Sequence, residues 1–431
     1  MKKCWFITSI FLCQWVMAQT NEKLVASFLN DTAIKTGHVG ICIYEPASKQ
    51  YLIQYNDQKN FTPSSNVKLF TLFAALQYLG DSIPGVQYIE TDTSIVLFPT
   101  ADPTLLHPSF NQQPVLKWLQ QSTKKLYLFQ SPQIIEPYGV GWAWDDYSDY
   151  FMPEKSAMPL YGNVVRFYGD KNNVHYYPSK MVTQFSVADD VNNASYNRAV
   201  TRNFYNNEFI LTQYIQNKLE EVPFITSYKN TALLLGDTVH QPINIIHDTS
   251  KLSNQKIKTF YSVPTVDVLK KMMFESDNFL AEQMLLVISN LRFHQMNTTL
   301  LIDSLLKTDF INIPQQPRWV DGSGLSRYNL FTPQQFIYIL QKLTDCFGVK
   351  KLQQILPTAG EGTLKAYYNG NEQRIFAKTG SMSNNVSLSG TLKTDSGKNL
   401  RFSVIINNYS GSGKAGRRAI EKLLQGIIAT N

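Results

Sequence analysis

The sequence predicts an α+β fold in which both chain ends contribute to one antiparallel sheet flanked by helices. Near the N-terminus, β-rich runs over 39–44 and 51–55 are joined by a Pro-containing turn, which is typical of a hairpin. Near the C-terminus, three further β-rich runs precede an amphipathic helical pattern over 414–429. These three runs cover residues 374–378, 386–392 and 400–407.

The first residues have the pattern of an export signal. Two lysines precede an apolar run over 4–17 that ends at Ala18, so residues 1–18 are predicted to be a signal peptide cleaved before Gln19. The run is shorter than the roughly 20 apolar residues of a membrane-spanning helix, which disfavours an uncleaved anchor. A lipid anchor at Cys13 is disfavoured because bulky residues precede it. We expect an exported, periplasmic protein, with loose membrane association left open.

Charge and cysteine content exclude several classes of protein. Cleavage of the signal removes two lysines and no acidic residue, so the net charge falls from +7 to +5. Basic residues are dispersed, and no nucleic-acid partner is expected. Only Cys42 and Cys346 remain, and Cys42 lies in an apolar run that predicts a buried free thiol. The histidines lack metal-ligand spacing, so no metal or other cofactor is expected.

The mature chain, about 410 residues long, exceeds what one hydrophobic core usually supports, which predicts two or more domains. We expect residues 19–80 and 263–431 to form one domain and residues 81–262 to be a β-rich insertion. Turns rich in Asp, Asn and Pro separate the short strands of this insertion. The clearest predicted strands cover residues 94–98, 126–129, 164–168, 209–212 and 231–235.

A helical pattern predicts where the first candidate motif lies. Pro63 and Ser65 precede apolar positions at helical spacing over 69–79, and Gly80 ends the pattern. Ser65 therefore lies at the start of a buried helix, where the helix N-terminus favours negative charge. Lys68 follows one turn later, on the same face of the helix.

Two more motifs complete an ordered trio. A helix predicted from Pro264 onward leads to Ser276, Asp277 and Asn278, which interrupt the helical region, and Asp277 is expected to cap or orient it. Lys378-Thr379-Gly380 lies on an edge-like strand of the sheet.

Each motif also occurs elsewhere in the chain, so context has to select among the copies. The second copies begin at Ser122, Ser253 and Ser304 for Ser-x-x-Lys, at Lys35 for Lys-Thr-Gly, and at Ser64, Ser195 and Ser383 for Ser-x-Asn. No copy of Ser-x-x-Lys other than Ser65 starts a buried helix.

The trio supplies the groups for acyl transfer to a serine. A serine hydroxyl is a poor nucleophile and needs a base within hydrogen-bond reach and donors for the oxyanion. Lys68 can act as that base only when neutral, which requires a lowered pKa. Burial and a second ammonium from Lys378 would both lower it.

This combination resembles the penicillin-recognising serine enzymes. Within them, the chain resembles the D-alanyl-D-alanine carboxypeptidase/endopeptidase family, the class C low-molecular-mass penicillin-binding proteins. Further segments resemble that family's signatures in the same order, and they cover residues 101–105, 141–146, 163–165, 321–327 and 356–364. The resemblance implies a serine β-lactamase/transpeptidase-like fold, with 19–80 and 263–431 as the catalytic domain and a large insertion after the Ser-x-x-Lys helix.

The resemblance also implies roles for the motif residues. Ser65 would be the acylated nucleophile, Lys68 its base, Ser276 the relay that protonates the leaving D-alanine, and Asn278 a ligand of the substrate amide. In the third motif, Lys378 and Thr379 would bind the terminal carboxylate, and Gly380 would let the substrate backbone lie against the strand. The oxyanion would be held by the backbone amides of Ser65 and Ser381.

Four more residues resemble positions that hold the free end of the peptide side chain: Asp146, Phe151, Arg327 and Ser383. The chain departs from the family beside this region, with Tyr328 in place of a polar residue and Ser383-Asn384-Asn385 in place of a glycine-containing stretch. Trp142 and Trp144 are interpreted as packing residues, and the glycine-rich segment 321–324 as a tight turn that supports the site.

The implied function is a serine-type D-Ala-D-Ala carboxypeptidase that acts on peptidoglycan stem peptides and is covalently inhibited by β-lactams. Cleavage of D-alanyl crosslinks, the third residue of the stem peptide and the oligomeric state stay open. A β-lactamase-like hydrolase shares the trio but needs a water-activating group for fast deacylation. A noncatalytic wall-binding protein is the other alternative, and loss of a trio residue would indicate it.

Overall fold

The computed structural model describes residues 19–431 apart from 171–172, 193–197 and 217. The predicted signal peptide, residues 1–18, lies outside the described residues. Packing divides the chain into two compact units. The first unit contains the chain up to Phe73, Lys270–Ser276 and Ser304–Asn431, and the second contains Ala74–Leu269 and Asp277–Asp303. The domain boundaries predicted from the sequence stay a prediction.

The first unit is built on a five-stranded antiparallel sheet of order β14-β15-β16-β1-β2. The strands are β1 (His38–Glu45), β2 (Gln50–Tyr55), β14 (Ile375–Met382), β15 (Asn385–Lys393) and β16 (Asn399–Asn407). The N-terminal and C-terminal strands meet where His38 pairs with Asn407. The strand with the third motif, β14, lies at the edge, as the sequence predicts. The prediction of an α+β fold with an antiparallel sheet from both chain ends is confirmed.

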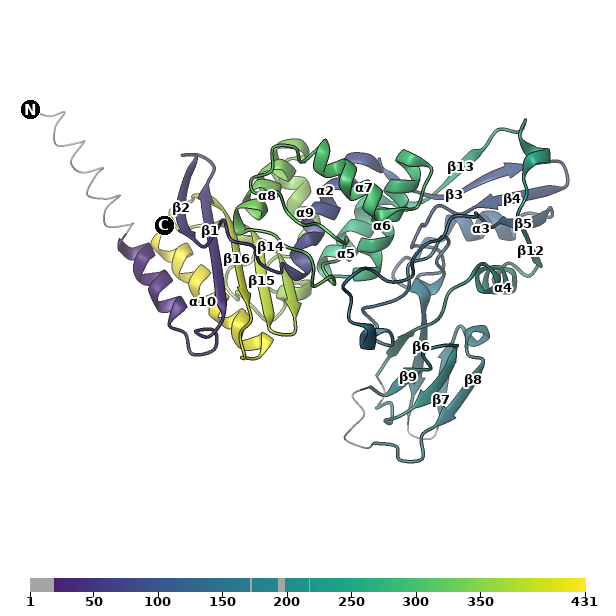
Figure 1. Ribbon diagram of the computed structural model, residues 1–431, viewed down its shortest axis with the longest axis horizontal. Coiled ribbons are helices and arrows are strands. Elements are labelled where there is room, and N and C mark those ends of the chain that lie inside the picture. The colour runs from purple at the N-terminus through teal and green to yellow at the C-terminus, as the bar shows by residue number, and fades with distance from the viewer. Residues whose placement is uncertain (1–18, 171–172, 193–197, 217) are drawn as a thin grey trace, which may run out of the picture. The chain divides into compact units, whose positions relative to one another are not determined.

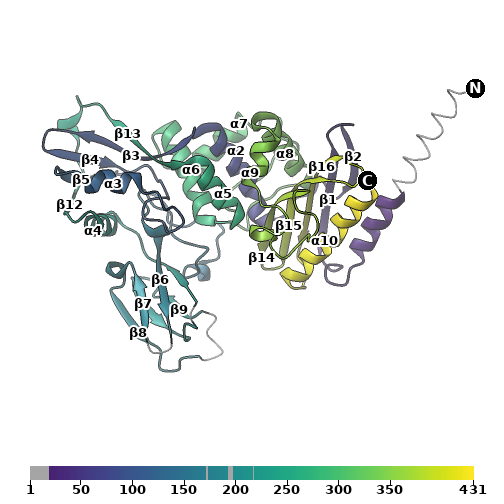
Figure 2. The same ribbon diagram turned by 180° about the vertical axis from the view of Figure 1, so that it is seen from behind.

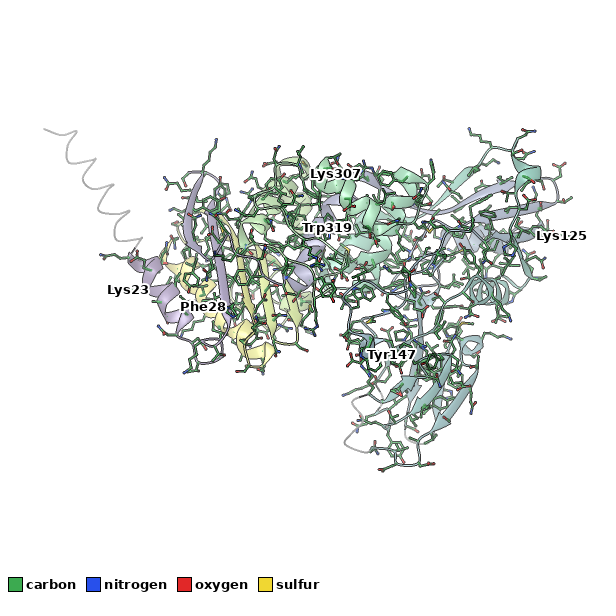
Figure 3. The ribbon with its side chains drawn as sticks, viewed as in Figure 1. Lys23, Phe28, Lys125, Tyr147, Lys307 and Trp319 are labelled. Carbon is green, nitrogen blue, oxygen red and sulfur yellow. The ribbon has the colours of Figure 1, made fainter. Side chains whose placement is uncertain are left out.

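Two helical segments cover one face of this sheet. Figures 1 and 2 both show α10 (Gly413–Thr430) beside the helical residues 19–29, against the strands. The apolar stripe of α10 and Phe28, labelled in Figure 3, are buried in the same core as Val404 of β16. Burial of these faces is what holds the chain ends on the sheet.

Further helices of the first unit pack on its sheet or on one another. They include α8 (Pro333–Phe347), which packs on β1 and β16, and α9 (Val349–Ile355). The first turns of helix α2 (Lys68–Tyr78) belong to this unit. They include Phe70, whose ring centroid lies 5.0 Å from that of Phe331 and 5.6 Å from that of Trp319. Because large aromatic rings surround Phe70, the start of α2 is held rigidly. Unit boundaries fall within α2 and also within α5 (Thr265–Phe274) and α7 (Thr298–Lys307). A further boundary lies just before α6 (Asn278–Phe293).

The second unit contains three sheets around a core of its own. The largest has the order β12-β5-β4-β3-β13 and mixes parallel and antiparallel pairs. Its strands are β3 (Ser82–Glu90), β4 (Ser94–Phe98), β5 (Lys125–Phe129), β12 (Ile243–Ile246) and β13 (Lys258–Pro264). The smaller sheets have the orders β11-β6-β7 and β8-β10-β9. Their strands are β6 (Val164–Gly169), β7 (Val174–Tyr177), β8 (Gln184–Val187), β9 (Val200–Arg202), β10 (Glu208–Leu211) and β11 (Glu220–Pro223).

One predicted strand is wrong. Residues 231–235 lie within the helix α4 (Tyr228–Val239). In the second unit, α4 packs on β12 and α3 (Pro114–Gln120) packs on β13 of the large sheet. The side chain of Ser227 accepts a hydrogen bond from the backbone N–H of Asn230 and caps α4. Leu234, Leu235 and Val239 are buried, which is helical rather than alternating spacing. The run of leucines therefore belongs to an amphipathic helix.

Two smaller predictions can be compared directly with the structure. Cys42 is a buried free thiol, as predicted, whereas Cys346 is exposed. Across the described ranges, no helix is both long enough and apolar enough to cross a membrane.

Candidate active site

The first motif forms a hydrogen-bonded serine and lysine. Ser65 lies in the short 3-10 helix η1 (Ser64–Val67), which runs directly into α2. Its hydroxyl accepts a hydrogen bond from Lys68 Nζ at 2.9 Å, and the same nitrogen donates to the carbonyl of Ser323 at 2.7 Å. Lys68 is fully buried, whereas Ser65 is half-buried. A reactive hydroxyl and a candidate base thus lie in contact at an accessible position.

A glycine-containing turn holds this pair in place. The carboxylate of Asp321 accepts hydrogen bonds from the backbone N–H of Gly324 at 2.9 Å and of Ser326 at 2.6 Å. Gly324 has a φ of +86°, and a Cβ there would lie 2.0 Å from the carbonyl oxygen of Ser64. Only glycine allows the turn to approach the nucleophile's backbone this closely. The interpretation of 321–324 as a tight turn that supports the site is confirmed.

The sequence reasoning missed one functional group in this turn, the Ser323 carbonyl that binds Lys68. A backbone carbonyl leaves no mark in the side-chain pattern, so only the three-dimensional contact identifies it.

Both serine motifs contain a strained backbone. Ser64 has a φ of +50° and Ser276 a φ of +59°, in the left-handed region that non-glycine residues rarely occupy. Such strain persists only where surrounding structure enforces it, and it concentrates at functional sites. Two serine motifs far apart in the sequence share this feature.

The second and third motifs meet within the first unit. Lys378 of β14 donates to Ser276 Oγ at 2.8 Å and to the Thr379 carbonyl at 2.7 Å. Lys378 is fully buried. Burial, followed by the charges of Lys68 and Arg417, lowers the pKa of Lys378 well below its ordinary value. The neutral form of this amine is therefore favoured relative to an exposed lysine.

Gly380 is required by the packing of the protein itself. A Cβ at this position would lie 2.3 Å from Ser387 Oγ and 2.8 Å from the carbonyl oxygen of Pro63. Ser387 donates a hydrogen bond to that same Pro63 carbonyl at 2.7 Å. The end of β14 thus packs directly against the turn that carries Ser65.

In the second unit, Asn278 and Phe151 are in contact. The side-chain amide of Asn278 donates to the backbone carbonyl of Phe151 at 2.9 Å. Asp277 accepts from the backbone N–H of Leu280 at 2.9 Å and is the N-cap of α6, which confirms the expected capping role. Phe151 therefore orients Asn278 through its main chain, a contact that the sequence does not predict.

The other predicted substrate residues are Asp146, Arg327 and Ser383. Asp146 is half-buried in the 3-10 turn η2 (Trp144–Asp146) of the second unit. Arg327 and Ser383 are exposed in the first unit, and within the described part of the chain neither is hydrogen-bonded to another predicted site residue. Trp144 is 74% exposed, so its interpretation as a packing residue is wrong.

Comparison with known proteins gives a consistent result. The model of the D-Ala-D-Ala carboxypeptidase 3 (S13) family matches residues 21–429. The D-alanyl-D-alanine carboxypeptidase DacB of Haemophilus influenzae is 24% identical in an alignment 418 residues long, and the alignment covers 86% of this chain and 86% of DacB.

Two solved structures show the same fold. Penicillin binding protein 4 of Haemophilus influenzae has a TM-score of 0.74 and 22% identity, covering 94% of this chain and 98% of its own. A predatory peptidoglycan endopeptidase of Bdellovibrio bacteriovorus has a TM-score of 0.55 and 15% identity, covering 91% and 92%. With the family model spanning nearly the whole described chain, this protein belongs to the D-Ala-D-Ala carboxypeptidase 3 (S13) family of serine peptidases.

Proposed function

We propose that the protein removes the terminal D-alanine from peptidoglycan stem peptides through an acyl-enzyme on Ser65. The observation that carries this proposal is the 2.9 Å hydrogen bond between Lys68 Nζ and Ser65 Oγ. A hydroxyl with its base already in reach is the arrangement that acyl transfer requires. The name of the DacB relative, a D-alanyl-D-alanine carboxypeptidase, supports the same substrate class.

In the acylation step, the neutral Lys68 amine takes the proton of the Ser65 hydroxyl. Ser65 Oγ attacks the carbonyl carbon of the penultimate D-alanine, and the carbonyl π electrons move onto oxygen. The backbone amides of Ser65 and Ser381 stabilise this oxyanion. When the tetrahedral intermediate collapses, the C–N bond breaks and the acyl group stays on Ser65.

The leaving amine of the last D-alanine needs a proton. Ser276, hydrogen-bonded to Lys378 at 2.8 Å, relays this proton, and Lys68 returns the one it took to the relay. Water then attacks the ester carbonyl while Lys68 accepts its proton. The bond between the acyl carbon and Ser65 Oγ breaks, Lys68 returns the proton to that oxygen, and the shortened peptide leaves with a new carboxyl group.

The remaining residues hold the peptide. Asn278, fixed by the Phe151 carbonyl, binds the substrate amide, while Lys378 and Thr379 contribute to binding of the terminal carboxylate. Asp146, Phe151, Arg327 and Ser383 recognise the free end of the peptide side chain. Gly380 lets the substrate backbone lie along β14.

Release of D-alanine from a synthetic pentapeptide ending in D-Ala-D-Ala is the primary test. We expect stoichiometric D-alanine, and a peptide ending in D-Ala-L-Ala serves as the matched control that should stay intact. A protein that folds but releases no D-alanine would refute the proposed activity. A crosslinked muropeptide dimer, assayed beside the pentapeptide, measures how much endopeptidase activity accompanies it.

A β-lactam separates this function from that of a β-lactamase. We expect penicillin to acylate Ser65 covalently, with an intact-mass increase equal to one penicillin and a modified peptide that contains Ser65. The adduct should persist for many minutes, because a peptidase lacks a group devoted to rapid ester hydrolysis. Fast multiple turnover of penicillin would instead favour the β-lactamase alternative.

We also propose that the protein is exported to the periplasm. The pattern over residues 1–18 supports this localisation. N-terminal sequencing of protein recovered from the periplasmic fraction should begin at Gln19, and an intact Met1 in the cytosolic fraction would contradict it.

A further inference from the structure

An arginine of the closing helix lies at the end of the third motif. Arg417 of α10 donates from Nη2 to Ser381 Oγ at 2.7 Å and from Nε to the same atom at 3.3 Å. Ser381 directly follows Lys378-Thr379-Gly380 and is exposed, and Arg417 is half-buried. The guanidinium group is therefore positioned at an accessible place where the substrate strand is expected to end.

The guanidinium group of Arg417 is not paired with a carboxylate in the described residues, unlike those of two other arginines of the first unit. Arg418, its neighbour, is paired with Glu421, and Arg374 with Asp395. Over the residues that the structure describes, Arg417 has no ion pair, and two of its N–H groups point at one neutral hydroxyl. The Nε–Nη2 edge of a guanidinium group matches the two oxygens of a carboxylate far better than a single hydroxyl oxygen.

A small cavity next to this arginine is also lined by a residue of the third motif, Thr379. The cavity has room for no more than about one water molecule, and Arg417 and Thr379 both line it. The rest of the lining is mainly apolar, with Leu364, Leu388 and Ile420. These apolar side chains pack beside the guanidinium group, and Ser381, which it contacts, is exposed.

The two cations near the strand end are not equivalent. Lys378 is fully buried and donates to Ser276 and to its neighbour's carbonyl, both groups of the protein itself. Burial, followed by the charges of Lys68 and Arg417, lowers its pKa, which favours its neutral form. A guanidinium group keeps its charge at every pH at which the protein is folded. Arg417 is thus the permanent positive charge at this end of β14.

We propose that Arg417 binds the terminal carboxylate of the substrate, with the Ser381 hydroxyl holding the guanidinium group in place before the substrate arrives. This assignment rests on the proposed carboxypeptidase function and names the group that recognises a free C-terminus. Thr379 contributes its hydroxyl to the same carboxylate, while Lys378 acts mainly on Ser276.

The test compares two peptides that differ only at the C-terminus, one ending in a free D-Ala-D-Ala carboxylate and one in the corresponding methyl amide. We expect Arg417→Gln to lower kcat/KM for the free carboxylate by about 100-fold, because a charge-assisted bidentate contact is lost. The slower reaction of the amide should change less than about threefold. Lys414→Gln, which removes an exposed cation from the same helix, should leave both reactions unchanged.

The outcomes separate this proposal from the proposed function. If the wild type releases D-alanine and Arg417→Gln releases it at the same kcat/KM, the carboxylate assignment alone is wrong. An equal loss for both peptides would mean a structural role for Arg417 and would also overturn the assignment. If the wild type acts on neither peptide, both proposals fall. Arg417→Lys keeps a positive charge but loses the two parallel N–H groups of the guanidinium. This variant should fold and keep part of the preference for the free carboxylate over the methyl amide, so the comparison stays measurable if Arg417→Gln unfolds.

Discussion

Two buried lysines of the first unit have nearly the same surroundings. Lys68 donates to a serine hydroxyl at 2.9 Å and to a backbone carbonyl at 2.7 Å. Lys378 does the same at 2.8 Å and 2.7 Å. They differ in the carbonyl that accepts a hydrogen bond from the side-chain nitrogen atom Nζ. For Lys68 this is the carbonyl of Ser323, in a turn far away in the sequence, whereas for Lys378 it is the carbonyl of the next residue in β14, Thr379.

This similarity has a chemical consequence. A short hydrogen bond from a lysine to a serine does not by itself identify the nucleophile, since both serines are half-buried and both have such a bond. Position at a helix start does not separate them either, because Ser65 lies in the turn that runs into α2 and Ser276 directly precedes Asp277, the N-cap of α6. The assignment of roles to the two pairs is therefore a testable difference.

The largest effect should come from exchanging the two serines for alanine. Ser65→Ala should abolish acylation by penicillin, because no oxygen remains to form the ester. Ser276→Ala should still be acylated, but on the order of 100-fold more slowly, since only a proton relay is lost. Intact-mass spectrometry over time measures both.

The opposite pattern, with Ser65→Ala still labelled and Ser276→Ala unlabelled, would exchange the two roles. Labelling lost in both variants would mean that the pairs act as one unit. Each variant should melt within a few degrees of the wild type, which separates chemistry from folding.

Replacing each lysine by methionine should separate the general base, Lys68, from Lys378, which donates a hydrogen bond to Ser276. Lys68→Met should slow acylation by roughly 10²- to 10⁴-fold, the range for loss of general base catalysis. Lys378→Met should slow it by about 10- to 100-fold, the effect of losing a charged hydrogen bond to Ser276. Stopped-flow or quench measurement of acylation gives both rates. Equal losses would contradict different roles.

The turn that holds Lys68 should be sensitive to one methyl group. In Gly324→Ala, the new Cβ would lie 2.0 Å from the Ser64 carbonyl, so stability should fall by roughly 3 kcal/mol or more. Gly397→Ala is the matched control, because Gly397 also has a positive φ, +90°, but open space around it. Its cost should be about 1 to 2 kcal/mol from backbone strain alone.

Thermal melts and acylation rates test this pair of variants together. Gly324→Ala should lose acylation more than its stability loss explains, because the shifted turn carries the carbonyl that binds Lys68. Gly397→Ala should acylate at the wild-type rate. Equal costs in the two variants would mean that the close approach at Ser64 is relieved by a small shift.

The same comparison explains which parts of the site the sequence could predict. Ser65 and Lys68 are three residues apart, so the helical turn alone brings them together. Ser276 and Lys378 are 102 residues apart, and their contact depends on how the sheet and α5 pack. The resemblance to a family implied that both motifs belong to one site, but it did not predict this contact.

Predictions of strands and helices likewise succeed where local sequence decides the structure and fail where tertiary packing decides it. The edge position of β14 and the hairpin of β1 and β2 follow from local patterns and turn residues, and the structure has both. Residues 231–235 were ambiguous because a short apolar run suits either a strand or a buried helix. The cap at Ser227 and burial on one face of α4 decide for the helix, and that burial is a tertiary property.

The smallest expected effect is a pH dependence of stability that separates Lys378 from an ordinary lysine. Its pKa is lowered by burial and by the charges of Lys68 and Arg417, so the unfolded chain holds this proton more tightly than the folded one. Stability should therefore rise with pH from the lowered pKa of the folded state up to the ordinary value of 10.5. Lys378→Met removes this titration and the desolvation of an amine, so it should be the more thermostable protein at low pH.

Melting temperatures of both proteins between about pH 6 and 9 check this expectation. The advantage of Lys378→Met should be largest at the acidic end and should shrink as pH rises, because the wild type sheds the buried charge. Lys393→Met, at the exposed end of β15, is the control and should keep the wild-type pH trend. A constant difference between the wild type and Lys378→Met across this range would mean that Lys378 keeps one protonation state throughout, and the contrast between the two lysines would then rest on their hydrogen bonds alone.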